Sequence, residues 1–150
     1  MALEDLYREV IIDHFRNPRN RFSLSHVSGH AEGHNPLCGD RVDVEVEVSD
    51  GVVSGIAISG QGCSISQAAA SMMSEAVKGK TLEEIAEVTD LFKTMMSIKS
   101  GNAGILNAGQ PGSVLGDLES LQGLRKFPVR IKCANLSFTT LEEALAEATH

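Results

Sequence analysis

A strict alternation of valine with acidic residues is the sequence feature that most restricts how this chain can fold. The alternating segment consists of Val42, Asp43, Val44, Glu45, Val46, Glu47 and Val48. Because successive side chains of a β-strand point to opposite faces, the pattern predicts a strand with one apolar face and one acidic, solvent-facing side. A turn sequence at 49–51 and a second apolar run at 52–59 predict an antiparallel hairpin, and we expect a third strand at 27–32.

Helical periodicity occurs on both sides of this hairpin. Apolar residues recur at helical spacing over 3–15 and again over 65–77, where the methionines are expected in the core. A capping box at 81–84 predicts a helix that reaches about residue 98. The remaining expectations are a glycine-rich loop at 99–113, a short helix at 114–124, an interruption at Pro128 within 125–132, and a last helix that begins at Thr139 or Thr140.

The order of these elements predicts an α+β fold. We expect an N-terminal helix, a small antiparallel three-stranded sheet, and then a cluster of helices packed on one face of that sheet. A chain of 150 residues buries roughly 70% of the surface that its unfolded form exposes, so its core needs neither a disulfide nor a metal ion. Residues 1–150 are therefore expected to form a single domain.

Charge and hydropathy exclude several classes of function. The chain carries 13 Lys and Arg against 20 Asp and Glu, for a net charge of -7, and such an acidic protein is poorly suited to the phosphate backbone of nucleic acids. No apolar run reaches membrane-spanning length, and the acidic N-terminal segment resembles no secretory signal. The expected location is the cytoplasm, with neither a nucleic acid nor a membrane as partner.

Three cysteines are the most reactive candidates in the sequence. All three are expected at the edges of helices or strands. Cys38 lies in a turn before the alternating strand, and Cys63 lies at the start of the helix expected at 65–77, where the helix amides favour a thiolate. Cys133 follows two cations, Arg130 and Lys132, which could act similarly. The odd number of cysteines and a reducing compartment argue against disulfides. A thiol with a pKa of about 8.5 is only about 3% ionised at pH 7, and a shared metal ion would overcome that. The alternative interpretation is three small buried apolar residues.

Asp40 and several histidines are the other candidate ligands. Asp40 follows Cys38 by two residues in a glycine-containing turn, so both could face one ion, although aspartate also forms such turns by itself. His14 lies at the edge of the apolar stripe of the first helix, where a packing role is favoured over ligation. The remaining histidines considered are expected to be solvated loop residues: His26, His30 and His34.

Four segments resemble the IscU/SufU family of U-type iron-sulfur cluster assembly proteins, which are similar to the NifU N-terminal domain. They are YREVIIDHFRNPRN at 7–20, NPLCGD at 35–40, GCSIS at 62–66 and RIKCANL at 130–136. The resemblance covers almost the entire chain. Lys132 stands where IscU-type proteins carry a histidine ligand, and the segment between Cys63 and Cys133 is long, which is typical of the SufU branch.

The resemblance implies a zinc-dependent protein that accepts persulfide sulfur from a pyridoxal phosphate-dependent, SufS-like cysteine desulfurase. It implies four zinc ligands, the first of which is also the sulfur acceptor: Cys38, Asp40, Cys63 and Cys133. Downstream assembly proteins or apo-proteins would receive the sulfur, and no independent enzymatic turnover is expected. Whether Arg130 and Lys132 tune the thiols or bind the desulfurase stays open.

Other functions remain as alternatives. A scaffold would bind iron and assemble a transient [2Fe-2S] cluster on the same four residues before passing it to apo-proteins. A structural metal site would have no transfer role. A zinc hydrolase is disfavoured, because no glutamate or histidine general base accompanies the cysteine motifs.

Overall fold

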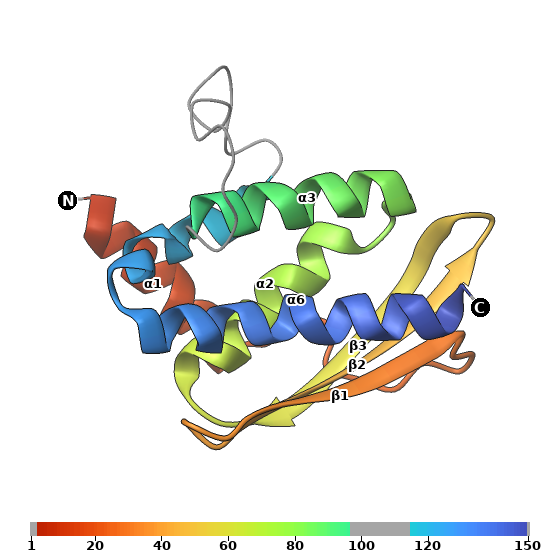
Figure 1. Cartoon of the computed structure of the whole chain (residues 1–150), viewed down its shortest axis with the longest axis horizontal. Helices are drawn as coiled ribbons and strands as arrows, with labels where there is room; N and C mark the ends of the chain where they lie inside the picture. The colour runs from red at the N-terminus through yellow and green to blue at the C-terminus, as the bar shows by residue number, and fades with distance from the viewer. Residues whose placement is uncertain (1–2, 97–114, 150) are drawn as a thin grey trace.

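Three antiparallel strands form a sheet at one side of the fold (Figure 1). They are β1 (Gly29–Asn35), β2 (Asp40–Ser49) and β3 (Val52–Gln61), in that spatial order. The computed structural model describes residues 3–96 and 115–149. The predicted hairpin is confirmed, and its turn residues Asp50 and Gly51 both have positive φ angles, 52° and 76°. The third strand lies slightly later than the expected 27–32.

Helical segments make up most of the rest of the described chain. They are α1 (Leu3–Arg16), α2 (Ser64–Val77), α3 (Leu82–Met95), the 3-10 helix η1 (Gly116–Lys126) and α6 (Pro128–Ala148). The helices predicted at 3–15, at 65–77 and after the capping box are confirmed. The predicted end near residue 98 and the loop predicted at 99–113 lie outside the described residues. Across both described stretches, no helix is long and apolar enough to cross a membrane.

The C-terminal helix corrects the sequence prediction. It begins at Pro128, not at Thr139 or Thr140, so the predicted interruption was wrong. The amide groups in the first turn of a helix have no partner within the helix, so a proline there loses no hydrogen bond. Pro128 can therefore start the helix instead of breaking it. Thr140 is buried inside α6, where its hydroxyl donates to the Leu136 carbonyl at 2.8 Å. The short helix predicted at 114–124 is η1, which joins α6 directly at Phe127.

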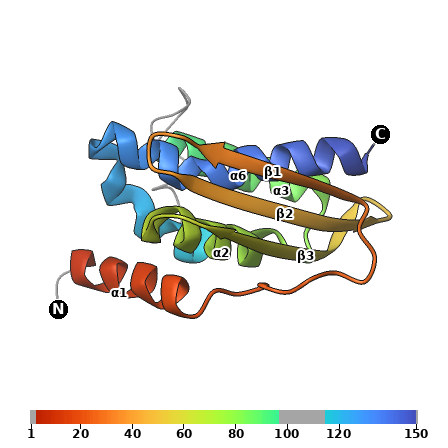
Figure 2. The same ribbon diagram turned by 90° about the horizontal axis from the view of Figure 1, so that it is seen from below.

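The two faces of the sheet have different neighbours. Val42, Val44 and Val46 are fully buried on the side where α6 contacts β1 and β2. Helix α1 packs on α2 and η1 and not on this face (Figure 2). The predicted arrangement, with helices on one face of a small antiparallel sheet, is confirmed.

The acidic face of the sheet is less open to solvent than the alternation predicts. The segment 17–28 runs along it, and the Leu24 amide donates to Oε1 of Glu45 at 3.3 Å. Nδ1 of His26 lies 3.3 Å from Oε2 of Glu47. The acidic side chains are therefore partly covered by the segment that leads from α1 to β1.

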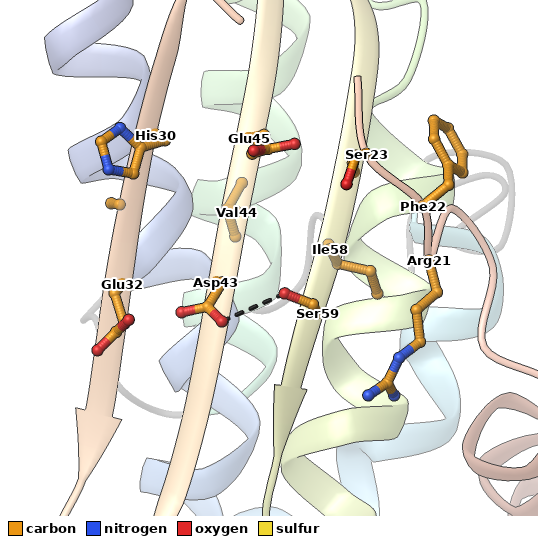
Figure 3. Close-up of a pocket in the computed structure, with 12 residues that line it drawn as sticks. Arg21, Phe22, Ser23, His30, Glu32, Asp43, Val44, Glu45, Ile58 and Ser59 are labelled. Carbon is orange, nitrogen blue, oxygen red and sulfur yellow. Dashed lines mark hydrogen bonds between the residues drawn. The ribbon is translucent and has the colours of Figure 1, made fainter. Parts of the chain in front are cut away.

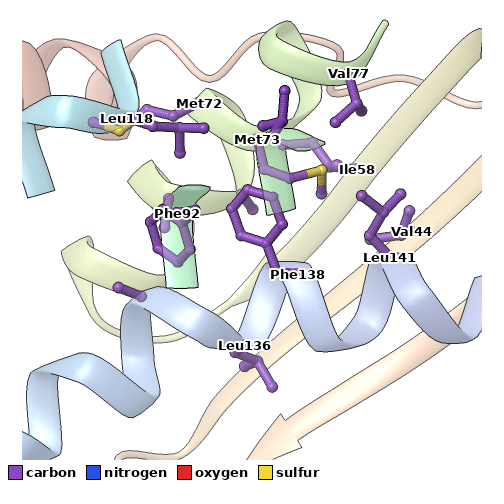
Figure 4. Packing of buried hydrophobic residues seen from close by; sticks show 14 of the residues in the cluster. Val44, Ile58, Met72, Met73, Val77, Phe92, Leu118, Leu136, Phe138 and Leu141 are labelled. Carbon is purple, nitrogen blue, oxygen red and sulfur yellow. The ribbon is translucent and has the colours of Figure 1, made fainter. Parts of the chain in front are cut away.

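The core lies between the sheet and the helices (Figure 4). Phe92 of α3 and Phe138 of α6 stack with their ring centroids 4.4 Å apart and an interplanar angle of 23°. Met72 and Met73 of α2 are buried in the same cluster. The methionines of this helix therefore fill the core, as the sequence predicts.

The capping box provides a test of local stability. The Thr81 hydroxyl accepts from the Glu84 amide at 3.1 Å, and the Glu84 carboxylate accepts from the Thr81 amide at 2.9 Å. Thr81→Ala removes the cap of α3, and we expect the free energy of unfolding to fall by about 1 kcal/mol. Urea denaturation measures this change. Thr81→Ser keeps the hydroxyl and should retain most of the stability; an equal loss in both variants would contradict the capping role.

Candidate metal centre

The strand register brings separate segments of the chain to one end of the sheet (Figure 1). Asn35, the last residue of β1, pairs with Asp40, the first residue of β2. On the other side of β2, Arg41 pairs with Gln61, the last residue of β3. The β1–β2 turn and the β3–α2 connection therefore adjoin each other, and both carry a predicted ligand.

Three of the predicted ligands lie within reach of a single ion. The Sγ atoms of Cys38 and Cys133 are 3.4 Å apart, and these atoms and a carboxylate oxygen of Asp40 all lie within 4.8 Å of one another. Cys38 comes from the β1–β2 turn, Asp40 from the start of β2 and Cys133 from α6. Cys63 lies at the edge of this group, with its Sγ 3.7 Å from Oδ2 of Asp40. The structure thus brings all four predicted residues to one end of the molecule.

Asp40 connects the start of β2 to the start of α2. It is 2% exposed, and its Oδ1 accepts a hydrogen bond from the Cys63 amide at 2.8 Å. Burial by itself would raise the pKa of Asp40, but hydrogen bonds from the Cys63 amide and from the Cys133 and Cys63 thiols outweigh burial and hold the pKa below its usual value. The carboxylate is therefore ionised at neutral pH and can act as an oxygen ligand.

Cys63 is the N-cap residue of α2. Its backbone is extended, with φ -69° and ψ 160°, and its Sγ accepts from the Ser66 amide at 3.5 Å. Helix N-termini favour negative charge because their first amides have no partner within the helix. Cys63 therefore lies beside the first amides of α2, at the position that the sequence predicts.

Cys133 differs from the other two cysteines in its surroundings. It is fully buried and lies within α6, so the expectation that it occupies an element edge was wrong. Burial raises the pKa of the Cys133 thiol, and its contacts with Cys38 and Asp40 raise it further. Metal binding at this sulfur therefore has to displace a proton.

Asn35 is a residue of this site that sequence reasoning missed. It is 7% exposed, and its Nδ2 lies 3.4 Å from Oδ2 of Asp40 and 3.6 Å from Sγ of Cys133. Its own Oδ1 accepts from the Leu37 amide at 3.3 Å, which fixes the amide orientation. Asn35 therefore orients two predicted ligands, and its place in the turn motif at 35–40 is the signal that could have identified it.

Gly62 allows the β3–α2 connection to pass close to Asp40. Its φ angle is +142°, a conformation that L side chains rarely adopt. A Cβ atom at this position would overlap Oδ1, Cα and Cβ of Asp40. The absence of a side chain is therefore required for the hydrogen bond between the Cys63 amide and Asp40.

The donor atoms are compatible with zinc. Tetrahedral zinc binds thiolates at about 2.3 Å, which places two sulfur ligands roughly 3.8 Å apart. The separation of 3.4 Å between the Cys38 and Cys133 sulfurs is close to that value. A sulfur and an oxygen ligand would lie roughly 3.6 Å apart, and Cys63 Sγ and Asp40 Oδ2 are 3.7 Å apart. Thiolates and carboxylates are both usual zinc ligands, so the residues present fit this ion.

None of the histidines considered from the sequence belongs to this group of ligands. His14 is fully buried in the packing of α1, in agreement with its predicted packing role. Three exposed histidines each lie next to a glutamate: His26, His30 and His34. The last two belong to β1, which corrects the expectation of a loop. Arg130 and Lys132 are exposed on α6.

A separate hollow of about 440 Å³ lies on the outer face of the sheet. Figure 3 shows Arg21 and Phe22 on one side of it and Glu32 of β1 on the other. Between them, Asp43 accepts a hydrogen bond from the Ser59 hydroxyl at 3.2 Å. No cysteine lines this hollow. It is therefore distinct from the group of Cys38, Asp40, Cys63 and Cys133, which we call the thiol site.

Comparison with known proteins extends over nearly the whole chain. The sequence is 43% identical over 145 residues to the zinc-dependent sulfurtransferase SufU of Bacillus subtilis (strain 168), covering 97% of this chain and 92% of that protein. It is 36% identical over 148 residues to the iron-sulfur cluster assembly scaffold protein IscU of Streptococcus pyogenes serotype M1, covering 99% and 87%. The crystal structure of a candidate iron-sulfur cluster assembly scaffold protein for the SUF system of Fervidobacterium islandicum AW-1 has a TM-score of 0.80 and 28% identity, with coverage of 96% and 99%.

A domain profile gives the same result as the individual relatives. The profile of the NifU-like N terminal domain matches residues 6–134. The matched range contains every residue of the thiol site together with the sheet and the start of α6. Sequence and fold agree on this point, and the chain belongs to the family of NifU-like N-terminal domains.

Proposed function

We propose that this protein is a SufU-type, zinc-dependent acceptor of persulfide sulfur in iron-sulfur cluster assembly. The observation that carries the proposal is the convergence of three thiols and a buried carboxylate at one end of the sheet. Similarity to the zinc-dependent sulfurtransferase SufU over 97% of the chain supports it. Similarity to proteins named for iron-sulfur cluster assembly supports the wider assignment.

The proposed zinc ligands are the four residues of the thiol site: Cys38, Asp40, Cys63 and Cys133. Zinc, when bound, would hold the thiols in their ionised form at neutral pH. The effect would be largest for Cys133, because burial raises the pKa of that thiol. Asp40 would donate an oxygen and also hold Cys63 through its amide.

Cys38 is the proposed sulfur acceptor because it is the more accessible sulfur of the close pair. It lies partly exposed on the β1–β2 turn, whereas Cys133 is buried in α6. The Cys38 thiolate would attack the terminal sulfur of a persulfide on the partner. A new S–S bond forms at Cys38, the S–S bond on the partner breaks, and the partner's cysteine leaves as a thiolate. The terminal sulfur keeps its proton, and the exchange needs no external oxidant or reductant.

The proposed sulfur donor is a pyridoxal phosphate-dependent cysteine desulfurase of the SufS type. Such a partner has to approach Cys38, and large apolar side chains stand exposed near the proposed ligands in the sequence. Leu37, next to Cys38, is 65% exposed, and Val129, one helical turn before Cys133, is 51% exposed. Exposed apolar groups at a functional site are typical of protein interfaces. The proposed recipients are downstream iron-sulfur assembly proteins or apo-proteins.

A scaffold for a transient [2Fe-2S] cluster is the second candidate function. The similarity to the IscU scaffold protein favours it, and the same four residues would serve as ligands. Clusters are usually held by four cysteines, so three thiolates and one carboxylate would form a weaker shell. Such a shell would suit a protein that passes its cluster on.

Native mass spectrometry of the anaerobically purified protein separates the two functions. We expect a single zinc ion per chain, no iron, and the mass of one additional sulfur atom after incubation with a cysteine desulfurase and cysteine. An iron-sulfur mass without zinc would support the scaffold instead. Lys132→Ala serves as the control: an ammonium group cannot donate a lone pair to a metal, so this variant should bind the same amount of zinc.

A further inference from the structure

A buried histidine links three helical segments of the molecule. His14 of α1 is fully buried; its Nδ1 lies 2.8 Å from the Ser71 hydroxyl of α2, and its Nε2 lies 2.8 Å from Oδ2 of Asp117 in η1. A carboxylate only accepts hydrogen bonds, so Nε2 carries the hydrogen and donates to Asp117. One imidazole ring thus binds α2 and η1 at the same time. We call these three residues the His14 bridge.

Neighbouring contacts hold the same three segments together. The Arg19 amide, just after α1, donates to the hydroxyl of Ser71 at 2.9 Å. Gln122 of η1 donates to the Tyr7 hydroxyl of α1 at 2.7 Å. Helix α1 therefore has a fixed position against both α2 and η1, and the His14 bridge is the one of these contacts that reaches both.

Both partners of His14 lead directly to a cysteine of the thiol site. Ser71 lies two turns along α2 from its N-cap residue Cys63, a distance of roughly 12 Å. Asp117 lies in η1, whose C-cap residue Phe127 is also the N-cap residue of α6, the helix that carries Cys133. No loop separates η1 from α6, so a shift of η1 moves the start of α6 with it.

A second metal site is the other interpretation of this cluster, and the contacts argue against it. One ligand atom each of His14, Glu75 and Asp117 lies within 4.8 Å of the others. However, Glu75 already pairs with the Arg19 guanidinium at 3.6 Å, and both ring nitrogens of His14 have hydrogen-bond partners. The cluster is satisfied without an ion, which favours a role in holding the helices.

We propose that His14 is a positioning residue for the thiol site. By binding Ser71 and Asp117 together, it fixes the separation between α2 and the η1–α6 segment, and through them the separation of the Cys63 and Cys133 thiols. The inference rests on the proposed function for its effect on zinc, because the separation of the two thiols would then set how tightly zinc is retained. The spacing of the thiols can also be measured without zinc.

Zinc release from Asp117 variants tests the proposal. Transfer of zinc from the loaded protein to a chromogenic chelator should be about tenfold faster in Asp117→Ala than in the parent. A lost hydrogen bond to a charged group typically corresponds to a factor of about this size. Asp117→Asn keeps an amide oxygen that can accept from Nε2 and should restore the parent rate. Glu119→Ala removes another carboxylate of η1 and should leave the rate unchanged. Asp117 is 57% exposed, so its removal leaves no large cavity.

A metal-free measurement keeps this inference separate from the proposed function. In a Cys38→Ser background only Cys63 and Cys133 remain, and phenylarsine oxide captures two thiols only when they lie close together. We expect weaker capture when Asp117→Ala is added to this background and restored capture with Asp117→Asn.

A parent protein that binds no zinc would overturn the proposed function, while the arsenical result would still decide the spacing of the two thiols. If Asp117→Ala lowers the thermal midpoint but leaves zinc release and arsenical capture unchanged, His14 only stabilises the fold and the positioning role is wrong.

Discussion

We expect a Cys38→Ser variant to lose desulfurase-dependent persulfide formation completely and to remain folded. A serine hydroxyl is not ionised at neutral pH and cannot form a persulfide, so the transfer has no acceptor at this position. The fold should tolerate the change, because Cys38 lies on a partly exposed turn and its amide, which donates to the Asn35 carbonyl at 3.2 Å, is unaffected by the substitution. The expected result is a fall in sulfur transfer to background with little change in the unfolding transition.

Intact-protein mass spectrometry measures this loss after incubation with a cysteine desulfurase and cysteine under anaerobic conditions. Lys78→Ala is the matched control, since it removes an exposed charge at the end of α2 opposite Cys63 and leaves all three thiols in place. It should accept sulfur, in contrast to the serine variant. Persulfide at the parent level on Cys38→Ser would show that another cysteine is the acceptor.

Gly62→Ala should weaken both the fold and the metal site. The backbone conformation at φ +142° is strained for alanine, and the added Cβ would overlap Asp40. Asp40 would have to move away from the Cys63 amide, which it now binds at 2.8 Å. We expect the free energy of unfolding to fall by about 2 to 4 kcal/mol. We expect the zinc affinity to fall by roughly 10- to 100-fold, as when residues that orient metal ligands are lost.

Gly51→Ala separates backbone strain from the collision with Asp40. Gly51 also has a positive φ, +76°, but a Cβ there would meet no atom within 4 Å. This variant should lose stability through strain alone and keep the parent zinc affinity. Urea denaturation of the zinc-free proteins and competition with a chelator give the two quantities. Equal zinc affinities in the two glycine variants would refute the proposed contact between Gly62 and Asp40.

Local patterns in the sequence were sufficient for much of the fold. The valine alternation predicted β2, because a pleated strand with one buried face leaves that pattern directly in the sequence. The box at Thr81 and Glu84 predicted the start of α3, because both of its hydrogen bonds connect residues three apart. Pro128 was misleading, since proline is tolerated in the first turn of a helix and disruptive in its interior, and composition alone does not distinguish the two cases.

The sequence identified the three cysteines and Asp40 as candidates, but it did not identify Asn35 or show how these side chains meet. The position of Cys63 at a helix start followed from the glycine before it and the apolar stripe after it. The contact between Asn35 and Cys133 joins residues 98 positions apart, and that between His14 and Asp117 joins residues 103 apart. Contacts of this kind depend on strand register and helix packing, which no local pattern encodes.

The three sulfurs of the site are attached to backbone of different stiffness. Cys38 belongs to a turn at the end of a hairpin, Cys63 caps a helix, and Cys133 lies within the long helix that crosses the sheet. The work needed to displace each sulfur by an ångström increases in that order, because a turn can bend while a packed helix has to move as a whole. Ligand exchange at this site would therefore follow a sequence: the turn cysteine can leave and return while the helical cysteine keeps its place.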